Sequence, residues 1–130
     1  MSTDLTMLVW SVILTLVLML IAVSGATLTV GLPKLAGNRE DIPPGDCPGW
    51  VGRAQRLHRN MLENLPLFAV LVLVATVAGK SDDITALGAQ IFFWARIVHA
   101  VIYLVGLPWV RTPAWAVSVV GMVMILSRLV

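Results

Sequence analysis

Cysteine and charge are both scarce in this chain, and each shortage excludes a class of protein. The only cysteine, Cys47, supports neither a disulfide framework nor a cysteine-based metal cluster, so we interpret it as an ordinary reduced thiol. Charged residues make up 12% of the 130 residues, whereas hydrophobic residues make up 58%. A soluble domain of this length does not need that much apolar surface. The composition therefore indicates a protein that lies in a bilayer.

The first apolar segment lacks the basic residues of a secretory signal. No lysine or arginine precedes Lys34, and Asp4 is the only charged residue before it. The apolar stretch is also much longer than the core of a signal peptide, although the small residues of 23–26 end it. We therefore expect a retained helix. The chain also shows no internal repeat and no low-complexity tract.

Four apolar segments are long enough, or nearly so, to cross a membrane. A spanning helix needs roughly 20 predominantly apolar residues. The segments are about 5–32, 52–78, 84–106 and 113–129. Short connections near 79–83 and 107–112 make sequential helices antiparallel neighbours. We predict an all-α integral membrane protein, a single domain over residues 1–130 folded as an up-and-down bundle of four transmembrane helices.

Two of the predicted helices have recognisable starts. Ser81, Asp82 and Asp83 can cap the third helix, because short polar side chains accept hydrogen bonds from the first backbone N–H groups. Thr112 followed by Pro113 is typical of a cap and a first helical residue, and predicts the start of the fourth helix.

Lysine and arginine lie unevenly on the two sides of the predicted membrane. The first and third connections, together with the start of the second helix, hold six of them, and the opposite side holds only Lys80 and Arg128. Positive residues favour the cytoplasmic side. The asymmetry therefore predicts that both termini lie outside and that the first and third connections lie in the cytoplasm.

Polar side chains gather at the start of the second helix. Arg53, Arg56, Asn60 and Glu63 are spaced three, four and three residues apart, so they share one side of a helix. Arg59 lies four residues before Glu63 and can pair with it along the helix. Ionisable groups at membrane depth are expensive and by default indicate a functional site.

The third helix carries a matching polar stripe. Arg96, His99 and Tyr103 are spaced three and four residues apart, again on one side. Arg96 and Glu63 lie at depths that differ by about one helical turn, at about 1.5 Å per residue. Because the two helices are antiparallel neighbours, we expect an ion pair between these two residues. Arg111, in the third connection, lies at the same cytoplasmic mouth.

The polar residues have simpler interpretations when each is taken alone. The arginines could bind anionic lipid headgroups, His99 could be a packing residue, and Tyr103 could be an interfacial aromatic. No grouping of histidine, cysteine and carboxylate has the spacing of a metal site. A lipid anchor, however, has no use for Asn60 and Glu63 one or two turns deeper. The whole set suits a small anionic zwitterion meeting a lipophilic partner; glutathione fits this charge inventory, which alone does not single it out.

Two motifs on adjacent predicted helices carry a family resemblance. "RLHRNMLENLPLF", residues 56–68, resembles the second-helix signature of the MAPEG family, the membrane-associated proteins in eicosanoid and glutathione metabolism. "ARIVHAVIYLVGLPWVRT", residues 95–112, is similar to the third-helix signature of its prostaglandin E synthase branch. The resemblance covers essentially the whole chain. It implies a homotrimer of four-helix protomers with glutathione bound at each subunit interface near the cytoplasmic side.

The resemblance also assigns roles to individual residues. It implies glutathione contacts from the second and third helices and from the end of the first: Arg56, Arg59, Asn60, Glu63, His99, Tyr103 and Lys34. Arg111 resembles the arginine that stabilises the glutathione thiolate, and Thr112 stands where that branch has a serine hydroxyl near the sulfur. Trp115 replaces a tyrosine.

Together these observations predict a membrane-embedded, glutathione-dependent transferase of a bacterial inner membrane. We expect Arg111 and Thr112 to activate the thiolate for attack on lipophilic electrophiles or hydroperoxides, and we expect membrane lipids but no nucleic acid as partners. One alternative is a non-catalytic protein of the same family that binds lipid or glutathione. The other is a small four-helix exporter, in which Glu63 would be the coupling carboxylate.

Overall fold

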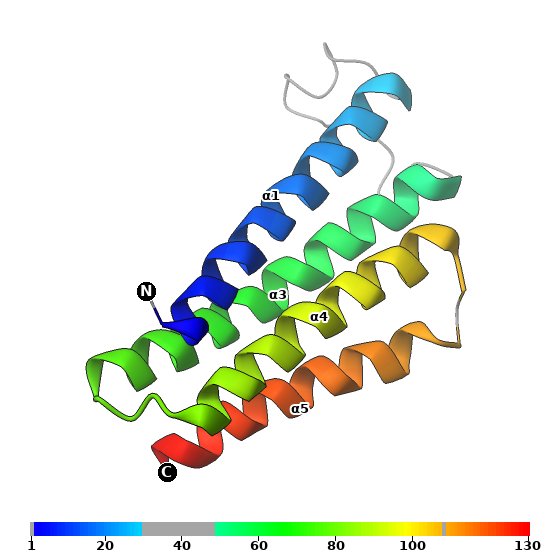
Figure 1. The fold of residues 1–130 in the computed structure, drawn as a ribbon. Coiled ribbons are helices and arrows are strands. Elements are labelled where there is room, and N and C mark those ends of the chain that lie inside the picture. The colour runs from blue at the N-terminus through cyan, green and yellow to red at the C-terminus, as the bar shows by residue number, and fades with distance from the viewer. Residues whose placement is uncertain (1, 30–48, 108) are drawn as a thin grey trace.

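In the part of the chain that the structure describes, four long helices run side by side. The structure is a computed structural model that describes residues 2–29, 49–107 and 109–130. The helices, labelled as in Figure 1, are α1 Thr3–Thr29, α3 Gly49–Val77, α4 Asp83–Val105 and α5 Arg111–Leu129. All four are long and apolar enough to cross a membrane. The expectation of an all-α membrane protein with four spans is therefore confirmed.

The two ends of the bundle differ in which parts of the chain they hold. Both chain termini and the α3–α4 connection lie at one end, which we call the terminus end (Figure 1). The C-terminus of α1, the start of α3 and the α4–α5 connection lie at the other, which we call the mouth end. Sequential helices are thus antiparallel, as the short connections predicted.

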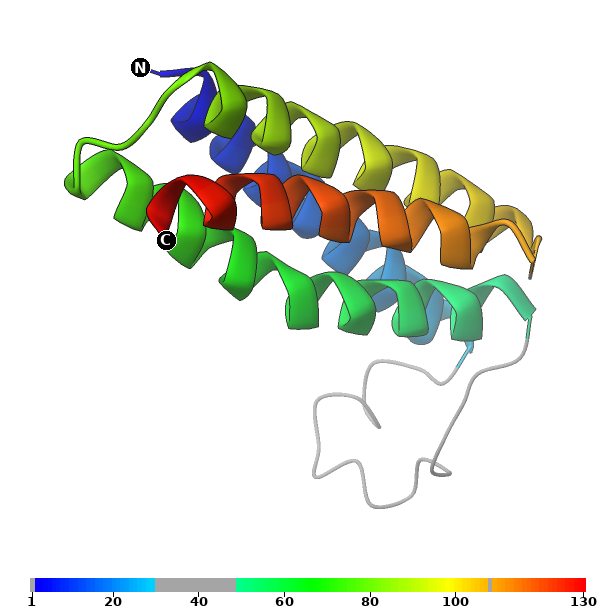
Figure 2. The same cartoon turned by 90° about the horizontal axis from the view of Figure 1, so that it is seen from below.

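The α3–α4 pair forms the middle of the bundle. In Figure 2, α1 lies behind this pair and α5 in front of it. α1 packs against α3 and α4, and α5 packs against α4 and α3, while α1 and α5 do not touch within the described ranges. Leu57, Met61, Phe68 and Phe92 are among the fully buried residues between the helices. The rings of Phe68 and Phe92 stack with centroids 4.0 Å apart.

Two glycines allow α4 and α5 to approach very closely. A Cβ atom added at Gly88 would lie 2.6 Å from the carbonyl oxygen of Gly121. One added at Gly121 would lie 2.5 Å from the oxygen of Gly88 and 2.8 Å from the nitrogen of Phe92. Small residues at such crossings let membrane helices gain van der Waals contact. This crossing makes α4–α5 the most extensive helix pair of the bundle.

Hydrogen bonds close the terminus end. Asp82 caps α4: its Oδ1 accepts from the backbone N–H groups of Ile84 and Thr85, each at 3.0 Å. The Thr85 hydroxyl in turn accepts from the N–H of Asp82 at 2.8 Å, which completes a capping box. Arg128, near the end of α5, pairs with Asp82 at 2.8 Å. The predicted cap of the third helix is thus confirmed.

Another hydrogen bond at the terminus end joins α1 to the loop between α3 and α4. The hydroxyl of Ser81 donates to Oδ2 of Asp4 at 2.8 Å, and Asp4 is buried. The charge on Asp82 is also supported electrostatically: the Thr85 backbone hydrogen bond, followed by the bond from Arg128, lowers the pKa of this carboxyl.

The mouth end differs from the sequence expectation at the start of α5. The helix begins at Arg111, and the residue in the cap position is Val110, which makes no side-chain cap bond. The expected cap by Thr112 is therefore wrong, because Thr112 lies already inside the first turn. The N–H groups of this turn are left without a side-chain acceptor. Lys34 and Cys47, both discussed above, lie outside the described residues.

Candidate functional site

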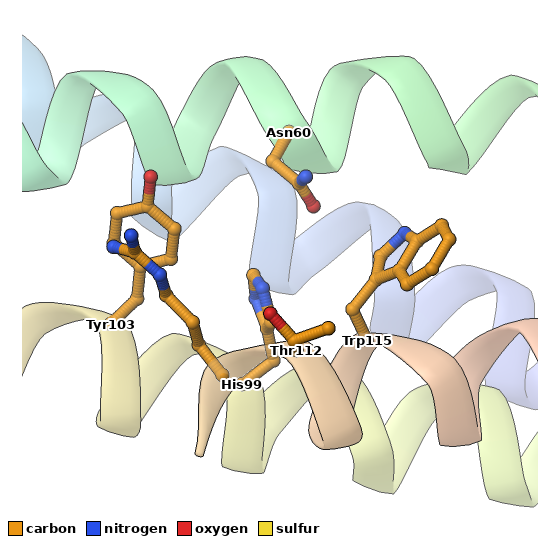
Figure 3. A pocket seen from close by; sticks show the side chains of 6 residues that line it. Asn60, His99, Tyr103, Thr112 and Trp115 are labelled. Atoms are coloured by element: carbon orange, nitrogen blue, oxygen red, sulfur yellow. The ribbon is translucent and has the colours of Figure 1, made fainter. Parts of the chain in front are cut away.

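A polar pocket opens between α3, α4 and α5 near the mouth end. Its volume is about 250 Å³. The lining residues are Asn60, His99, Tyr103, Arg111, Thr112 and Trp115 (Figure 3). Five of these were expected to belong to the site from the sequence. The structure therefore brings the second-helix amide, the third-helix stripe and the start of the fourth helix together in one protomer.

Aromatic contacts position Arg111 within the pocket. Its guanidinium carbon lies 4.9 Å from the centre of the Tyr103 ring, a cation–π geometry. The Tyr103 ring lies 5.5 Å from that of His99, with the two planes tilted by 54°. Figure 3 shows the hydroxyl of Tyr103 pointing toward α3. The stack holds a full positive charge at the pocket wall beside the uncapped start of α5, whose N–H groups carry a partial positive charge.

The floor of the site contains a buried arginine. Arg96 is only 1% exposed, and its Nη2 donates to Oδ1 of Asn60 at 2.5 Å. The amide of Asn64, one turn further along α3, donates to the backbone oxygen of Asn60 at 2.7 Å. Nε and Nη1 of Arg96 and Nδ1 of His99 are buried and have no hydrogen-bond partner in the described part of the chain. Buried donors without acceptors are rare and call for an explanation.

The expected ion pair between Glu63 and Arg96 is not formed. Glu63 is exposed on the outer side of α3, and Arg96 bonds to Asn60 instead. The reason is angular: residues three apart on a helix differ by about 60° in direction, so the polar stripe of α3 divides. Arg53 and Asn60 point toward α4, where Arg53 donates to the carbonyl oxygen of Leu104 at 3.2 Å. Glu63 is exposed instead.

Three of the expected glutathione contacts lie outside the pocket of the single protomer. Arg56, Arg59 and Glu63 are exposed on the outer side of α3 and are absent from the pocket lining. Their role stays a prediction, as does that of Lys34.

Sequence reasoning missed two features of this site. Trp115 lines the pocket, although the sequence marked it only as a replacement for a tyrosine. Its position three residues after Thr112, on the same side of α5, was the available signal. Arg96 was expected to hold Glu63, and its contact with Asn60 was not anticipated. Among the residues that the structure describes, no cluster of histidine, cysteine and carboxylate could hold a metal ion.

The fold and the pocket define a class: a four-span helical membrane protein with a cationic site at one end of the bundle. The family model of MAPEG matches residues 5–130, nearly the whole chain. The chain therefore belongs to the MAPEG family. None of the curated proteins with which the chain was compared matches it. Members of this family are generally glutathione-dependent membrane transferases or peroxidases.

Proposed function

We propose that this protein is a glutathione-dependent transferase that works on lipophilic electrophiles or hydroperoxides taken from the membrane. The observation that carries the proposal is the pocket itself. It places the guanidinium of Arg111, the hydroxyl of Thr112 and the amide of Asn60 around one cavity at the end of a membrane bundle. Family membership supports the same activity.

The donors of the site fit the chemistry of glutathione. Glutathione has two carboxylates, one ammonium group and a thiol, and the site offers guanidinium, imidazole, amide and hydroxyl groups. The guanidinium charge of Arg96, which lies behind Asn60, also favours a ligand that carries carboxylates. Asn60, His99 and Tyr103 would hold the tripeptide from within the protomer. Arg56, Arg59 and Glu63 would close over it from the exposed side of α3.

Arg111 is the residue that we assign to thiol activation. Bound glutathione supplies a thiol that, once ionised, attacks the electrophile. A free thiol has a pKa of about 8.5, and a neighbouring arginine or helix N-terminus favours its charged form. Arg111 lies at the uncapped start of α5, so both effects act at one place. Thr112 can donate one hydrogen bond to the same sulfur.

The lipophilic partner has a direct approach from the lipid. An apolar hollow of about 390 Å³ lies between α3 and α5, the same two helices that bound one side of the polar pocket. Its lining includes Leu67, Val70, Met122 and Leu126, which places it nearer the terminus end. A hydrophobic molecule in this hollow could extend toward Trp115 and the pocket without leaving the apolar phase.

The assembly that we propose is a homotrimer, as in the family. Glu63 is the central residue of the 29-residue helix α3 and is exposed on the protomer. A charge that faces lipid at the middle of a spanning helix is costly, so another chain has to cover it. Native mass spectrometry in detergent tests the stoichiometry. A monomer that binds glutathione at full affinity would contradict a site shared between subunits.

We further propose a bacterial inner membrane, with the mouth end in the cytoplasm and both termini outside. The excess of lysine and arginine near the mouth end supports this orientation. Labelling with an impermeant thiol reagent on whole cells tests it in a Cys47→Ser background. Ser2→Cys should react and Asn38→Cys should not. The reverse pattern would place the site on the opposite side of the membrane.

The activity is tested by replacing the activating arginine. Arg111→Leu should abolish the ultraviolet absorbance of bound thiolate and most conjugation of a small aryl halide. Raising the thiol pKa by two corresponds to about 2.7 kcal/mol, or about a hundredfold smaller ratio of thiolate to thiol. Glutathione binding should weaken much less. Arg128→Leu, which removes an arginine at the far end of the same helix, is the matched control and should retain full activity.

Two results would overturn this assignment. Full activity in Arg111→Leu would move the activating role to another cation of the site. If the wild type binds glutathione but shows no thiolate signal and no conjugation, the protein is instead a non-catalytic binding member of the family.

A further inference from the structure

Arg96 and Asn60 form a buried pair that fixes the direction of a side chain in the pocket wall. Arg96 itself does not line the pocket, whereas Asn60 does. The guanidinium donates to Oδ1 of Asn60 at 2.5 Å and is almost completely enclosed. Figure 3 shows the Asn60 side chain reaching from α3 toward α4 and α5. A change at Arg96 can therefore reach a ligand only through Asn60 or through its charge.

The chemistry of the contact decides which end of the Asn60 amide is available. A guanidinium only donates hydrogen bonds, so the atom that faces Arg96 must be the amide oxygen. The side-chain amide of Asn64 also approaches this oxygen, at 3.4 Å. The oxygen of Asn60 is thus occupied from two sides. Its Nδ2 group makes no hydrogen bond to any residue that the structure describes, and it remains for the ligand.

The charge of Arg96 favours the same kind of ligand group as the free donor of Asn60 does. No carboxylate lies within ion-pair distance of Arg96 among residues 2–29, 49–107 and 109–130. Two of its nitrogens have no acceptor there. Arg111 adds a second guanidinium across the pocket. A buried charge without a partner favours a ligand of opposite sign.

We infer that Arg96 is a positioning residue that turns Asn60 into a dedicated hydrogen-bond donor, so that the pocket selects a carboxylate group of its ligand and rejects an ammonium group at this point. The inference rests on the proposed function for the identity of the ligand, glutathione. It goes further in two ways. It assigns a role to Arg96, which lies outside the pocket wall, and it states that Asn60 donates the hydrogen bond to the ligand. A purely structural Arg96 would affect stability without changing which ligand groups are preferred.

The first experiment replaces the donor by an acceptor of the same shape. Asn60→Asp keeps an oxygen toward Arg96 but turns the second polar atom of the side chain from a donor into a carboxylate oxygen. Calorimetric titration is carried out with glutathione and with its dimethyl ester. Glutathione affinity should fall about tenfold or more, since a charged hydrogen bond is lost and repulsion replaces it. Affinity for the ester, which has no carboxylate, should hold or improve.

Gln55→Glu is the matched control for this substitution. It makes the same change from amide to carboxylate on the same helix, five residues away, at a residue that does not line the pocket. It should change the preference between glutathione and its ester much less than Asn60→Asp does. Equal or tighter glutathione binding by Asn60→Asp would show that Asn60 accepts from an ammonium group, and would overturn the inference.

The second experiment tests Arg96 directly. Arg96→Met frees the Asn60 amide to rotate, so the preference for glutathione over its dimethyl ester should shrink. Arg96→Lys keeps the charge and one donor and should restore part of that preference, which a role in packing alone would not produce. Arg53→Met is the control, because it removes another guanidinium from the α3–α4 contact without touching Asn60. An unchanged preference in both Arg96 variants would contradict the positioning role.

A ligand-free measurement separates this inference from the proposed function. Asn60→Asp places a carboxylate against Arg96 and should raise the melting temperature in detergent. The same substitution in the Arg96→Lys background should raise it less, because lysine lacks the planar fork of the guanidinium. If the wild type does not bind glutathione, the proposed function fails while this coupling still supports the Arg96–Asn60 contact. No coupling would overturn the inference whatever the ligand is.

Discussion

The terminus end and the mouth end of the bundle are built from similar helices but treat polar groups in opposite ways. At the terminus end, Asp82 receives two backbone hydrogen bonds and a bond from Arg128, and Asp4 receives the hydroxyl of Ser81. At the mouth end, α5 starts without a side-chain cap. Between the middle of the bundle and this end, buried nitrogens of Arg96 and His99 have no hydrogen-bond partner among the described residues.

This difference indicates that the two ends of the bundle have different roles, one in stability and the other in ligand binding. Polar groups that satisfy one another contribute to stability and have little left for a ligand. Polar groups held in place without partners cost stability, and they are the ones that a ligand can satisfy. The predictions below test this division, ordered from the largest expected effect on stability to the smallest.

Gly121→Leu should have the largest effect, because it breaks the contact on which the terminus half depends. A Cβ atom at position 121 would lie 2.5 Å from the carbonyl oxygen of Gly88 and 2.8 Å from the nitrogen of Phe92. Both are backbone atoms, which cannot move aside. Overpacking of this kind costs about 1–3 kcal/mol per inserted group or more. The yield of folded protein and the melting temperature in detergent measure the loss.

The matched control for the contact between Gly88 and Gly121 is Ala116→Leu on the exposed side of the same helix. It places the same leucine side chain on a surface that is exposed in the protomer and should change the melting temperature little. If both variants melt alike, the glycine crossing does not hold α4 and α5 together.

Ser81→Ala should have the next largest effect. It removes the hydroxyl that donates to the buried carboxylate of Asp4 at 2.8 Å. Leaving a buried acceptor without its donor costs about 1–3 kcal/mol, so thermal unfolding should occur at a lower temperature. Ser127→Ala removes an exposed serine at the same end and should have no such effect. Equal melting of wild type and Ser81→Ala would mean that water replaces the hydroxyl.

Acid should weaken the terminus end through Asp82, but only modestly because the carboxyl is open to solvent. Its folded-state pKa is lowered, first by the Thr85 backbone hydrogen bond and then by the bond from Arg128. A carboxyl with a depressed folded pKa stabilises the fold above its unfolded pKa, near 4, and loses this effect as the pH falls through the folded value. Asp82→Asn should remove that part of the acid sensitivity in melting curves between about pH 5 and pH 2. An identical pH profile in the variant would contradict the assignment.

Thr112→Val should leave stability unchanged while reducing the rate. The hydroxyl is not the cap of α5, so its loss removes no structural bond. One hydrogen bond to the developing thiolate is worth about 1 kcal/mol, which corresponds to about a fivefold slower conjugation of the aryl halide. Kinetics and melting curves on the same preparation test both parts. A lower melting temperature would show that Thr112 supports the fold after all.

Much of the helical framework was predictable from the sequence, because apolar runs of spanning length leave few alternatives. The cap at Asp82 was predictable as well, since it depends on local backbone geometry. The start of α5 was not: Thr112 and Pro113 have the chemistry of a helix start, but the helix begins earlier, at Arg111.

Which polar residues contact one another was less predictable from the sequence than the presence of these residues. Spacing placed Asn60 and Glu63 on one side of α3, but a side of a helix spans a wide angle, and packing decided that only Asn60 meets Arg96. Charge complementarity favoured Glu63, whereas direction favoured Asn60. Such choices depend on how two helices are rotated against each other, which a single sequence does not specify.

The most direct test of the account is the melting temperature of the wild type, Asp82→Asn and Asn60→Asp with and without saturating glutathione. A ligand that binds only the folded state adds about 2.7 kcal/mol of stability at a hundredfold excess over its Kd. We predict an equal upward shift in the wild type and in Asp82→Asn, and a shift of about half that size or less in Asn60→Asp, because its affinity is about tenfold or more lower. No shift in the wild type, or a shift that survives in Asn60→Asp but disappears in Asp82→Asn, would contradict a glutathione site at the mouth end.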